Sequence, residues 1–234
     1  MDMGQAKKRG TPEQRTQAAI ERREFGPLDL DSIQSHARKQ HADRLEKAVL
    51  KIAAARHLSD AVTLPYRALL RYMWECEYRG ACHSTSAVLF VLLSELGLTP
   101  KLCIGEVGAG GPYFDHSWVE LDGEVFDVAV SLPELGGEEV GGPVFASVDL
   151  YTGTTTDLDF AFANGEGLGE SALVAFNATL KGYAEAQSGE PDAGPNIWRR
   201  IIHLAPQVGL SCTAPNLVAK YGEVTREYRR RIQS

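Results

Sequence analysis

The sequence predicts an α+β fold in which a central helix packs on an antiparallel sheet, with helical extensions at both ends. An almost wholly apolar segment runs from Cys82 to Leu96, and a helix without a polar face is typically buried. Two segments of alternating polarity follow, 116–121 and 124–129. They are joined by Asp122-Gly123, one of the strongest short hairpin signals. Helix start and stop signals recur before and after this centre.

Helices are expected to fill the region before Cys82. Three segments begin with a capping Thr, Asp or Ser, or with a proline in the first turn: 11–24, 31–57 and the segment from Leu64-Pro65 onward. Phe25-Gly26-Pro27 separates the first two, because glycine followed by proline breaks a helix. We therefore expect a charged tail and short helix over 1–26 and a helical N-terminal region over 27–80.

The centre and the C-terminal part combine strands, loops and helices. Gly97 is expected to end the central helix, and Leu102–Val107 to form a strand. Gly108–Gly111 then makes either a mobile flap or a plain connection. Beyond the hairpin we expect loops with short strands over 131–170, helices over 173–186, 197–203 and 218–233, and a linker over 188–195. A core over 81–187 and a C-terminal helical extension over 188–234 follow from this division.

Composition excludes several classes of protein. The chain has 234 residues, 44% of them hydrophobic, which suits one globular domain with appendages. Its four cysteines show no C-x-x-C spacing, which argues against a disulfide framework and a structural zinc site. No secretory signal opens the sequence, and no apolar run is long enough to span a bilayer. We therefore expect a cytoplasmic protein without membrane contact, where a free thiol survives.

The net charge of −7 is unevenly distributed. Residues 102–180 contain no Lys or Arg while acids recur through them, and the basic residues cluster toward the two ends. One interpretation is an acidic face that favours basic substrates; the other is that basic terminal helices pack over an acidic centre. The basic ends are short and lack interleaved aromatic residues, so nucleic-acid binding is not expected.

Three residues suggest a catalytic site. A two-residue turn at Asp122-Gly123 pairs Leu121 with Glu124, and this register places His116, Trp118 and Asp127 on one face of the hairpin. The alternate residues, such as Val119 and Phe126, would form the packed face. His116 and Asp127 become diagonal neighbours roughly 7–8 Å apart, a gap that an imidazole and a carboxylate can bridge. Cys82 begins the central helix, where unpaired N–H groups stabilise an anion.

The chemistry of a Cys-His-Asp site fits these positions. A thiolate is the nucleophile, and a free thiol with a pKa near ~8.5 needs a neighbouring imidazolium to ionise at neutral pH. His116 would take the thiol proton, Asp127 would orient the imidazole, and the Cys82 N–H would donate to an oxyanion. A second oxyanion donor is not identified, although Trp74 and Tyr78 are candidates. Each residue also has a purely structural interpretation, and their joint arrangement favours the catalytic one.

The stretch Gly80–Val130 resembles the transglutaminase-like, papain-related superfamily. The motifs are Gly80-Ala81-Cys82, the apolar helix ending at Gly97, the strand Lys101–Gly105, the hairpin His116-Ser117-Trp118-Val119-Glu120, and Asp127. Within the superfamily the sequence is most similar to the leader peptidases of lasso-peptide biosynthesis. The resemblance implies a papain-like core over 81–187, a cysteine protease, amidase or acyltransferase, and no metal or organic cofactor. Cys82 would be the nucleophile, His116 the base and Asp127 the orienting acid, with Trp118 contacting substrate.

Several alternatives stay open. The acyl-enzyme can be resolved by water, as in a peptidase acting on a peptide or protein, or by an amine, as in a transferase. Arg79-Gly80-Ala81-Cys82 also resembles arylamine N-acetyltransferases, although their second glycine is Ala81 here. A non-catalytic binding module on the same fold is the rival from another class. A metal site using Cys82, His83, His116 and Asp115 is a further possibility; otherwise His83 has no assigned role.

Overall fold

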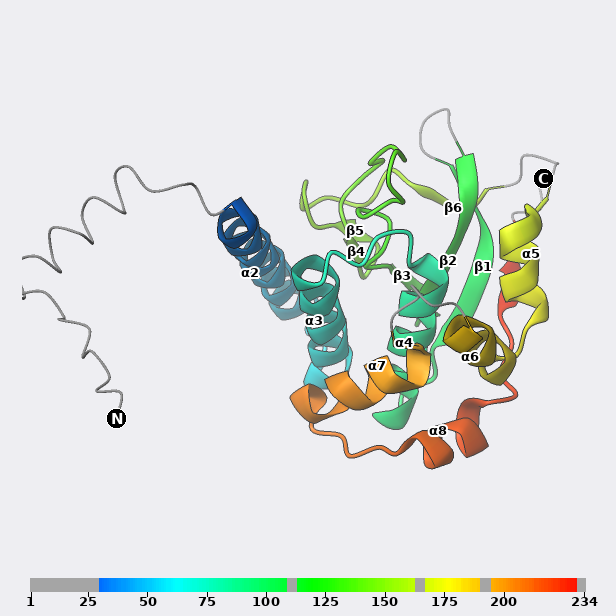
Figure 1. Cartoon of the computed structure of the whole chain (residues 1–234). Coiled ribbons are helices and arrows are strands. Elements are labelled where there is room, and N and C mark those ends of the chain that lie inside the picture. The colour runs from blue at the N-terminus through cyan, green and yellow to red at the C-terminus, as the bar shows by residue number, and fades with distance from the viewer. Residues whose placement is uncertain (1–29, 109–112, 163–166, 190–194, 231–234) are drawn as a thin grey trace, which may run out of the picture. The chain divides into compact units, whose positions relative to one another are not determined.

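The computed structural model describes residues 30–108, 113–162, 167–189 and 195–230. The chain divides into two compact units, Met1–Ala37 and Arg38–Ser234. Of the first unit the structure describes only residues 30–37, which begin a helix that continues into the second unit. That unit is an α+β domain whose central helix packs on a sheet, as the sequence predicts (Figure 1).

Helices α2 (Leu30–Arg56), α3 (Asp60–Glu75) and α4 (Cys82–Glu95) lead to the sheet. Helix α3 begins earlier than predicted, so that Pro65 lies inside it. The negative charge of Asp60 in the first turn stabilises the helix by interacting with the positive N-terminal end of its dipole. Pro65 is tolerated because it removes only one backbone hydrogen bond near that end. The predicted helix over 11–24 lies outside the described residues.

Helix α4 is the buried centre of the domain, as predicted. Its apolar residues pack against α3, α7 and the sheet in one continuous core that includes Val88, Leu92 and, from the sheet, Val119. Gly97 ends the helix with φ +83°, a conformation that glycine adopts without strain, and the Leu98 N–H donates to the Leu93 carbonyl over 3.1 Å. The first residue of α4 is therefore held by a rigid element.

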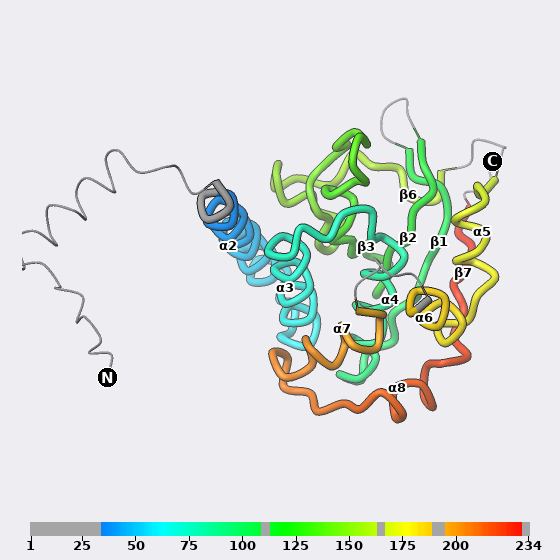
Figure 2. The backbone as a smooth tube through the Cα atoms, in the orientation of Figure 1, coloured from blue at the N-terminus to red at the C-terminus, as the bar shows by residue number. Residues whose placement is uncertain are grey.

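The sheet is built on two long strands, β1 (Lys101–Gly108) and β2 (Tyr113–Leu121), which run antiparallel side by side (Figure 2). β3 (Glu124–Phe126) pairs with the free edge of β2. The other edge of β1 is shared by β6 (Asp159–Phe162), which is antiparallel to it, and β7 (Glu227–Arg229), which is parallel. One parallel pair therefore extends the expected antiparallel sheet.

The predicted hairpin register is confirmed, and the second strand is shorter than predicted. Leu121 pairs with Glu124 and Val119 with Phe126, but the strand ends there instead of reaching Ala129. Asp127 leaves the hairpin and forms a bridge with Val144 of β4 (Val144–Phe145), which itself pairs with β5 (Val148–Asp149). The part of β2 that carries His116 thus lies beyond the end of β3.

Both faces of the sheet are covered. One face carries α4 and, over Ile104, α5 (Glu170–Asn177). The other carries Trp118, which packs against Phe160 and residues of the segment that follows the hairpin. The sequence analysis expected only the Val119 face to be packed, and the long segment after the hairpin is what covers the second face.

The helix predicted over 173–186 is two helices, α5 and α6 (Leu180–Gly189). The backbone of Ala178 is extended between them, and the Thr179 hydroxyl accepts a hydrogen bond from the Gly182 N–H over 3.2 Å at the start of α6. Threonine at such a position favours a new helix start because its side chain supplies the missing acceptor.

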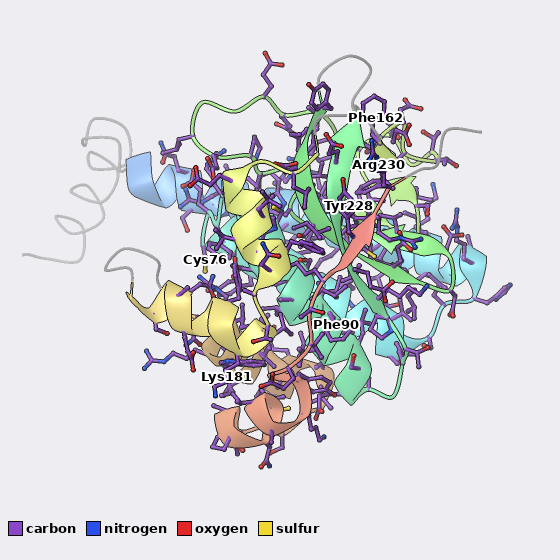
Figure 3. All side chains as sticks on the ribbon, turned by 90° about the vertical axis from the view of Figure 1, so that its right-hand side faces the viewer. Cys76, Phe90, Phe162, Lys181, Tyr228 and Arg230 are labelled. Atoms are coloured by element: carbon purple, nitrogen blue, oxygen red, sulfur yellow. The ribbon has the colours of Figure 1, made fainter. Side chains whose placement is uncertain are left out.

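The C-terminal part contains α7 (Ile197–Leu204), a 3-10 turn, α8 (Ala214–Tyr221) and then β7. The helix predicted over 218–233 is therefore wrong over 222–230, and its last three residues lie outside the described residues. Gly105 makes the parallel pairing of β7 with β1 possible, because a side chain there would collide with the Arg229 carbonyl. Figure 3 views the domain from the side that carries this strand, with Tyr228 on it.

Two further expectations concern the glycine-rich flap and a membrane-spanning helix. Gly108 ends β1, and the rest of the predicted glycine-rich flap, residues 109–111, lies outside the described residues. Within the described part of the chain, no helix has the length and apolar character needed to cross a bilayer.

Candidate active site

Cys82 is the first residue of α4 and follows a tight turn. Gly80 adopts φ +59° in this turn, and its N–H donates to the Leu132 carbonyl over 2.9 Å. Ala81 occupies the N-cap position, and its methyl side chain cannot accept a hydrogen bond from the N–H groups of the first helical turn. Those N–H groups and the helix dipole therefore stabilise negative charge at the half-buried Cys82 thiol.

His116 and Asp127 form a buried pair. The His116 Nε2 and an oxygen of Asp127, Oδ2, lie 2.6 Å apart, and both side chains are almost wholly buried. The Phe114 and His116 rings are nearly perpendicular, with an interplanar angle of 81° and centroids 5.5 Å apart. A short hydrogen bond in such surroundings sets the ring orientation of His116.

Asp127 is itself held on every side. Its second carboxylate oxygen, Oδ1, accepts the Ala129 N–H over 2.8 Å. Its backbone exchanges two hydrogen bonds with Val144, and its carbonyl also accepts the Tyr66 hydroxyl over 3.1 Å. Because β3 ends at Phe126, the backbone of Asp127 pairs with Val144, and in this position its carboxylate points toward His116.

Cys82 completes a chain of three side chains. It forms a hydrogen bond with His116, and because Nε2 of that ring is used by Asp127, Nδ1 is the nitrogen left for the thiol. With Nε2–H donating to Asp127, Nδ1 can accept the thiol proton. The structure thus brings Cys82, His116 and Asp127 together in the order that the sequence analysis expected.

The electrostatics favour a charged pair. Burial alone would raise the pKa of the Cys82 thiol, but the charge of His116 and hydrogen bonds with His116 and His83 outweigh it and lower the pKa to about 5. Burial would lower the pKa of His116, whereas the charges of Asp127 and Cys82 raise it to about 10. These shifts favour a thiolate beside an imidazolium over a neutral thiol beside a neutral imidazole.

His83 is a neighbour of the thiol that sequence reasoning left without a role. Its Nδ1 lies 2.7 Å from the Ser117 hydroxyl, and its ring also forms a hydrogen bond with Cys82. The only sequence signal was its position next to Cys82. That Ser117, across from α4 on β2, holds the ring requires the packing of helix on sheet, which no local pattern reveals.

Arg226 was also missed. Its guanidinium donates to the His83 carbonyl over 2.9 Å and to the Ala175 carbonyl over 2.8 Å, and it lies over the Tyr183 ring. Burial lowers the pKa of Arg226, while the negative charge of the Cys82 thiolate acts in the opposite direction. This buried cation ties the segment before β7 to the first turn of α4.

Two depressions begin at the turn before Cys82. One, here called the apolar cavity, has a volume of about 400 Å³ and opens on both Cys82 and His116. Its remaining wall includes the apolar residues Phe114, Val130, Leu132, Pro133 and Val140. The other, here called the polar hollow, has a volume of about 730 Å³ and includes Tyr78, Ser84, Tyr183 and Gln187. Both contain Gly80 and Ala81.

The other expected contacts have different placements. Trp118 is fully buried, and its indole N–H donates to Glu120 over 3.1 Å, so it offers no surface to a substrate in this structure. Trp74 packs on His41, with ring centroids 4.1 Å apart. Tyr78 remains beside the site because it lines the polar hollow.

The metal-site alternative finds no geometric support. Among the described residues, no group of three His, Cys, Asp or Glu side chains is arranged to hold a metal ion. Asp115, one of the suggested ligands, instead accepts the Gly169 N–H over 2.8 Å.

Comparison with known proteins gives one match. A sequence model described as the transglutaminase-like superfamily matches residues 17–134, about half of the chain, and the matched stretch contains Cys82, His116 and Asp127. No curated protein and no solved structure matches the chain.

Proposed function

Because the chain belongs to the transglutaminase-like superfamily, whose members are usually cysteine-dependent enzymes, we propose that it is a thiol-dependent hydrolase or acyltransferase acting on amide or peptide bonds. Cys82 is the nucleophile, His116 the acid and base, and Asp127 the residue that orients His116. The observation that carries the proposal is the continuous contact from Asp127 through His116 to a thiol whose surroundings favour the thiolate.

The first half of the reaction forms an acyl-enzyme. The Cys82 thiolate attacks the amide carbonyl carbon, a C–S bond forms, and the carbonyl oxygen becomes an oxyanion near the Cys82 N–H. When the intermediate collapses, the C–N bond breaks and the His116 imidazolium gives its proton to the departing amine. The product is a thioester on Cys82 with a neutral His116.

The second half regenerates the thiolate. His116 takes a proton from water or from an acceptor amine as that group attacks the thioester carbonyl. The C–S bond then breaks, the thiolate returns, and His116 is again an imidazolium. Water gives hydrolysis and an amine gives transfer. The nearer resemblance to leader peptidases remains a prediction, so leader-like peptides belong among the first substrates to try.

Acyl-enzyme formation tests this proposal. The protein is mixed with activated esters and peptide amides, and intact-mass spectrometry followed by peptide mapping locates any added acyl group. We expect the group on Cys82, none in Cys82→Ala, and unchanged acylation of Cys82 in Cys76→Ala, which removes an exposed thiol. Acylation spread over several cysteines would favour a non-catalytic binding module. Turnover retained by Cys82→Ala would instead favour a different nucleophile.

A further inference from the structure

The apolar cavity suggests what the site binds, and the inference rests on the proposed role of Cys82. The cavity reaches both Cys82 and His116, so a group bound there lies next to the reacting atoms. Its walls are mostly apolar, with Phe114, Val130 and Leu132 among them. Moving an apolar side chain from water onto such a wall is favourable, and the stabilisation is roughly proportional to the apolar area that becomes buried.

The wall is anchored to the catalytic turn. Leu132 accepts the Gly80 N–H, and its own N–H donates to the Ala129 carbonyl over 2.9 Å. The Glu134 side chain lies against Gly80 so closely that any larger residue at 80 would collide with it. The segment after Leu132 is therefore placed over the approach to Cys82, with Glu134 at its start.

The rim of the cavity is acidic. Glu134, Glu138 and Asp115 line it, and no Lys or Arg is among the lining residues that the structure describes. Glu134 and Glu138 are exposed, and within the described part of the chain neither carboxylate has an ion-pair partner. By contrast, two acids of the sheet have ion-pair partners: Glu120 pairs with Arg229 over 2.8 Å and Glu124 with Arg56 over 3.0 Å. The rim thus keeps a negative potential beside an apolar wall.

The polar hollow extends the binding surface past the nucleophile. Gly80 and Ala81, in the turn that leads to Cys82, line both the polar hollow and the apolar cavity. Leu135, which is 90% exposed, follows Glu134 and lines the hollow. A chain lying across the turn contacts both depressions, which suits a peptide better than a small acyl donor.

We infer that the substrate is a peptide segment in which an apolar side chain enters the apolar cavity and a neighbouring cationic side chain lies over Glu134 and Glu138. Charge complementarity selects the cation, and the apolar wall selects its neighbour. The acidic face for basic substrates that the charge distribution suggested would then be the rim of the apolar cavity.

Peptide binding to the full-length Cys82→Ala variant tests the inference without turnover. The probes are acetylated, amidated fluorescent peptides with one leucine flanked by lysines, by glutamines or by glutamates, and a lysine peptide with alanine in place of leucine. Fluorescence anisotropy gives the Kd of each in low and high salt. We expect the lysine–leucine peptide to bind about five- to twentyfold more tightly than the glutamine peptide, with the advantage reduced by salt.

Charge-removing variants locate the effect. Glu134→Gln with Glu138→Gln should abolish the preference for lysine, and Glu223→Gln, which removes an exposed carboxylate outside both depressions, should retain it. Equal Kd values for the lysine and glutamine peptides, or a preference that survives in the double variant, would overturn the inference. So would indifference to replacing leucine by alanine. Acylation of Cys82 in the wild-type protein is measured separately, so failure of the cavity assignment is distinguishable from failure of the proposed function.

Discussion

Cys82 at the start of α4 and Cys103 in the middle of β1 are thiols with opposite surroundings. Burial opposes ionisation of both, because a thiolate is poorly solvated in a protein interior. At Cys103, burial together with the negative charge of Glu120 raises the pKa to about 12. At Cys82, the charge of His116 and the hydrogen bonds with His116 and His83 outweigh burial and lower the pKa to about 5. Because burial raises the pKa of both thiols, the difference between them comes from the charges and hydrogen bonds that face each one.

The remaining cysteines extend the comparison. Burial and a neighbouring glutamate raise the pKa of Cys76 and likewise that of Cys212. Only at Cys82, among the cysteines of the chain, do the surroundings lower the pKa of the thiol.

The largest effect is expected from Asp127→Asn. An amide can donate to Nε2 of His116 and so favour the tautomer with its proton on Nδ1, which cannot accept the thiol proton. We expect kcat for an amide or peptide substrate to fall about 10²- to 10⁴-fold, and the pKa of Cys82 to rise as His116 loses its charged partner. Steady-state kinetics and pH-dependent alkylation measure the two effects.

Asp149→Asn is the matched control for Asp127→Asn. Asp149 is also buried and also accepts backbone N–H groups, from Gly142 over 2.8 Å and from Tyr151 over 2.7 Å. It should alter thermal stability with little effect on the pKa of Cys82. If Asp127→Asn keeps both wild-type turnover and wild-type thiol reactivity in a folded protein, Asp127 has no orienting role.

The pH dependence of kcat/KM should show a plateau with two falling limbs. Below about pH 5 the Cys82 thiolate takes up a proton and the nucleophile is lost, since its pKa is lowered to about 5. Above about pH 10 His116 loses the proton that the departing amine needs, since its pKa is raised to about 10. Each limb should fall about tenfold per pH unit. A rate that instead rises with pH to a single midpoint near ~8.5, the pKa of an ordinary thiol, would contradict the charged pair.

His83→Ala should have a smaller effect in the same direction. It removes one hydrogen bond to the thiolate but leaves His116 in place, so we expect Cys82 alkylation at pH 5 to slow by about three- to tenfold. Ser117→Ala, which frees the His83 ring without removing it, should slow alkylation less. An unchanged reaction in His83→Ala would show that the second histidine does not stabilise the thiolate.

The local part of the site could be predicted from the sequence. The apolar run from Cys82 identifies a buried helix, and Asp122-Gly123 sets the register that puts His116 and Asp127 on one face. The strand after the turn ends earlier than predicted because the backbone of Asp127 pairs with Val144 instead. No local sequence pattern around Val144 predicts this pairing. The same pairing produces the 2.6 Å contact with His116.

The surroundings of the site could not be predicted, because they depend on long-range packing. The strand β7 was expected to be helical, yet it pairs with β1 where Gly105 leaves room for its backbone. Arg226, just before it, reaches the first turn of α4 only after this pairing forms. The wall of the apolar cavity likewise comes from a segment with few regular elements, which the sequence analysis could describe only as loops.

Thiol alkylation across pH 5 to 9, with labelled sites mapped by mass spectrometry, tests the thiolate–imidazolium pair most directly. Wild-type protein is compared with His116→Ala at equal reagent concentration. We expect Cys82 to label far faster than Cys76, Cys103 and Cys212 below pH 7. Loss of His116 should slow Cys82 by roughly tenfold to 100-fold there, because an ordinary thiol is only about 1% ionised near pH 6.5. If Cys82 labels no faster than the other cysteines, or if its advantage persists without His116, the pair does not exist and the catalytic account is wrong.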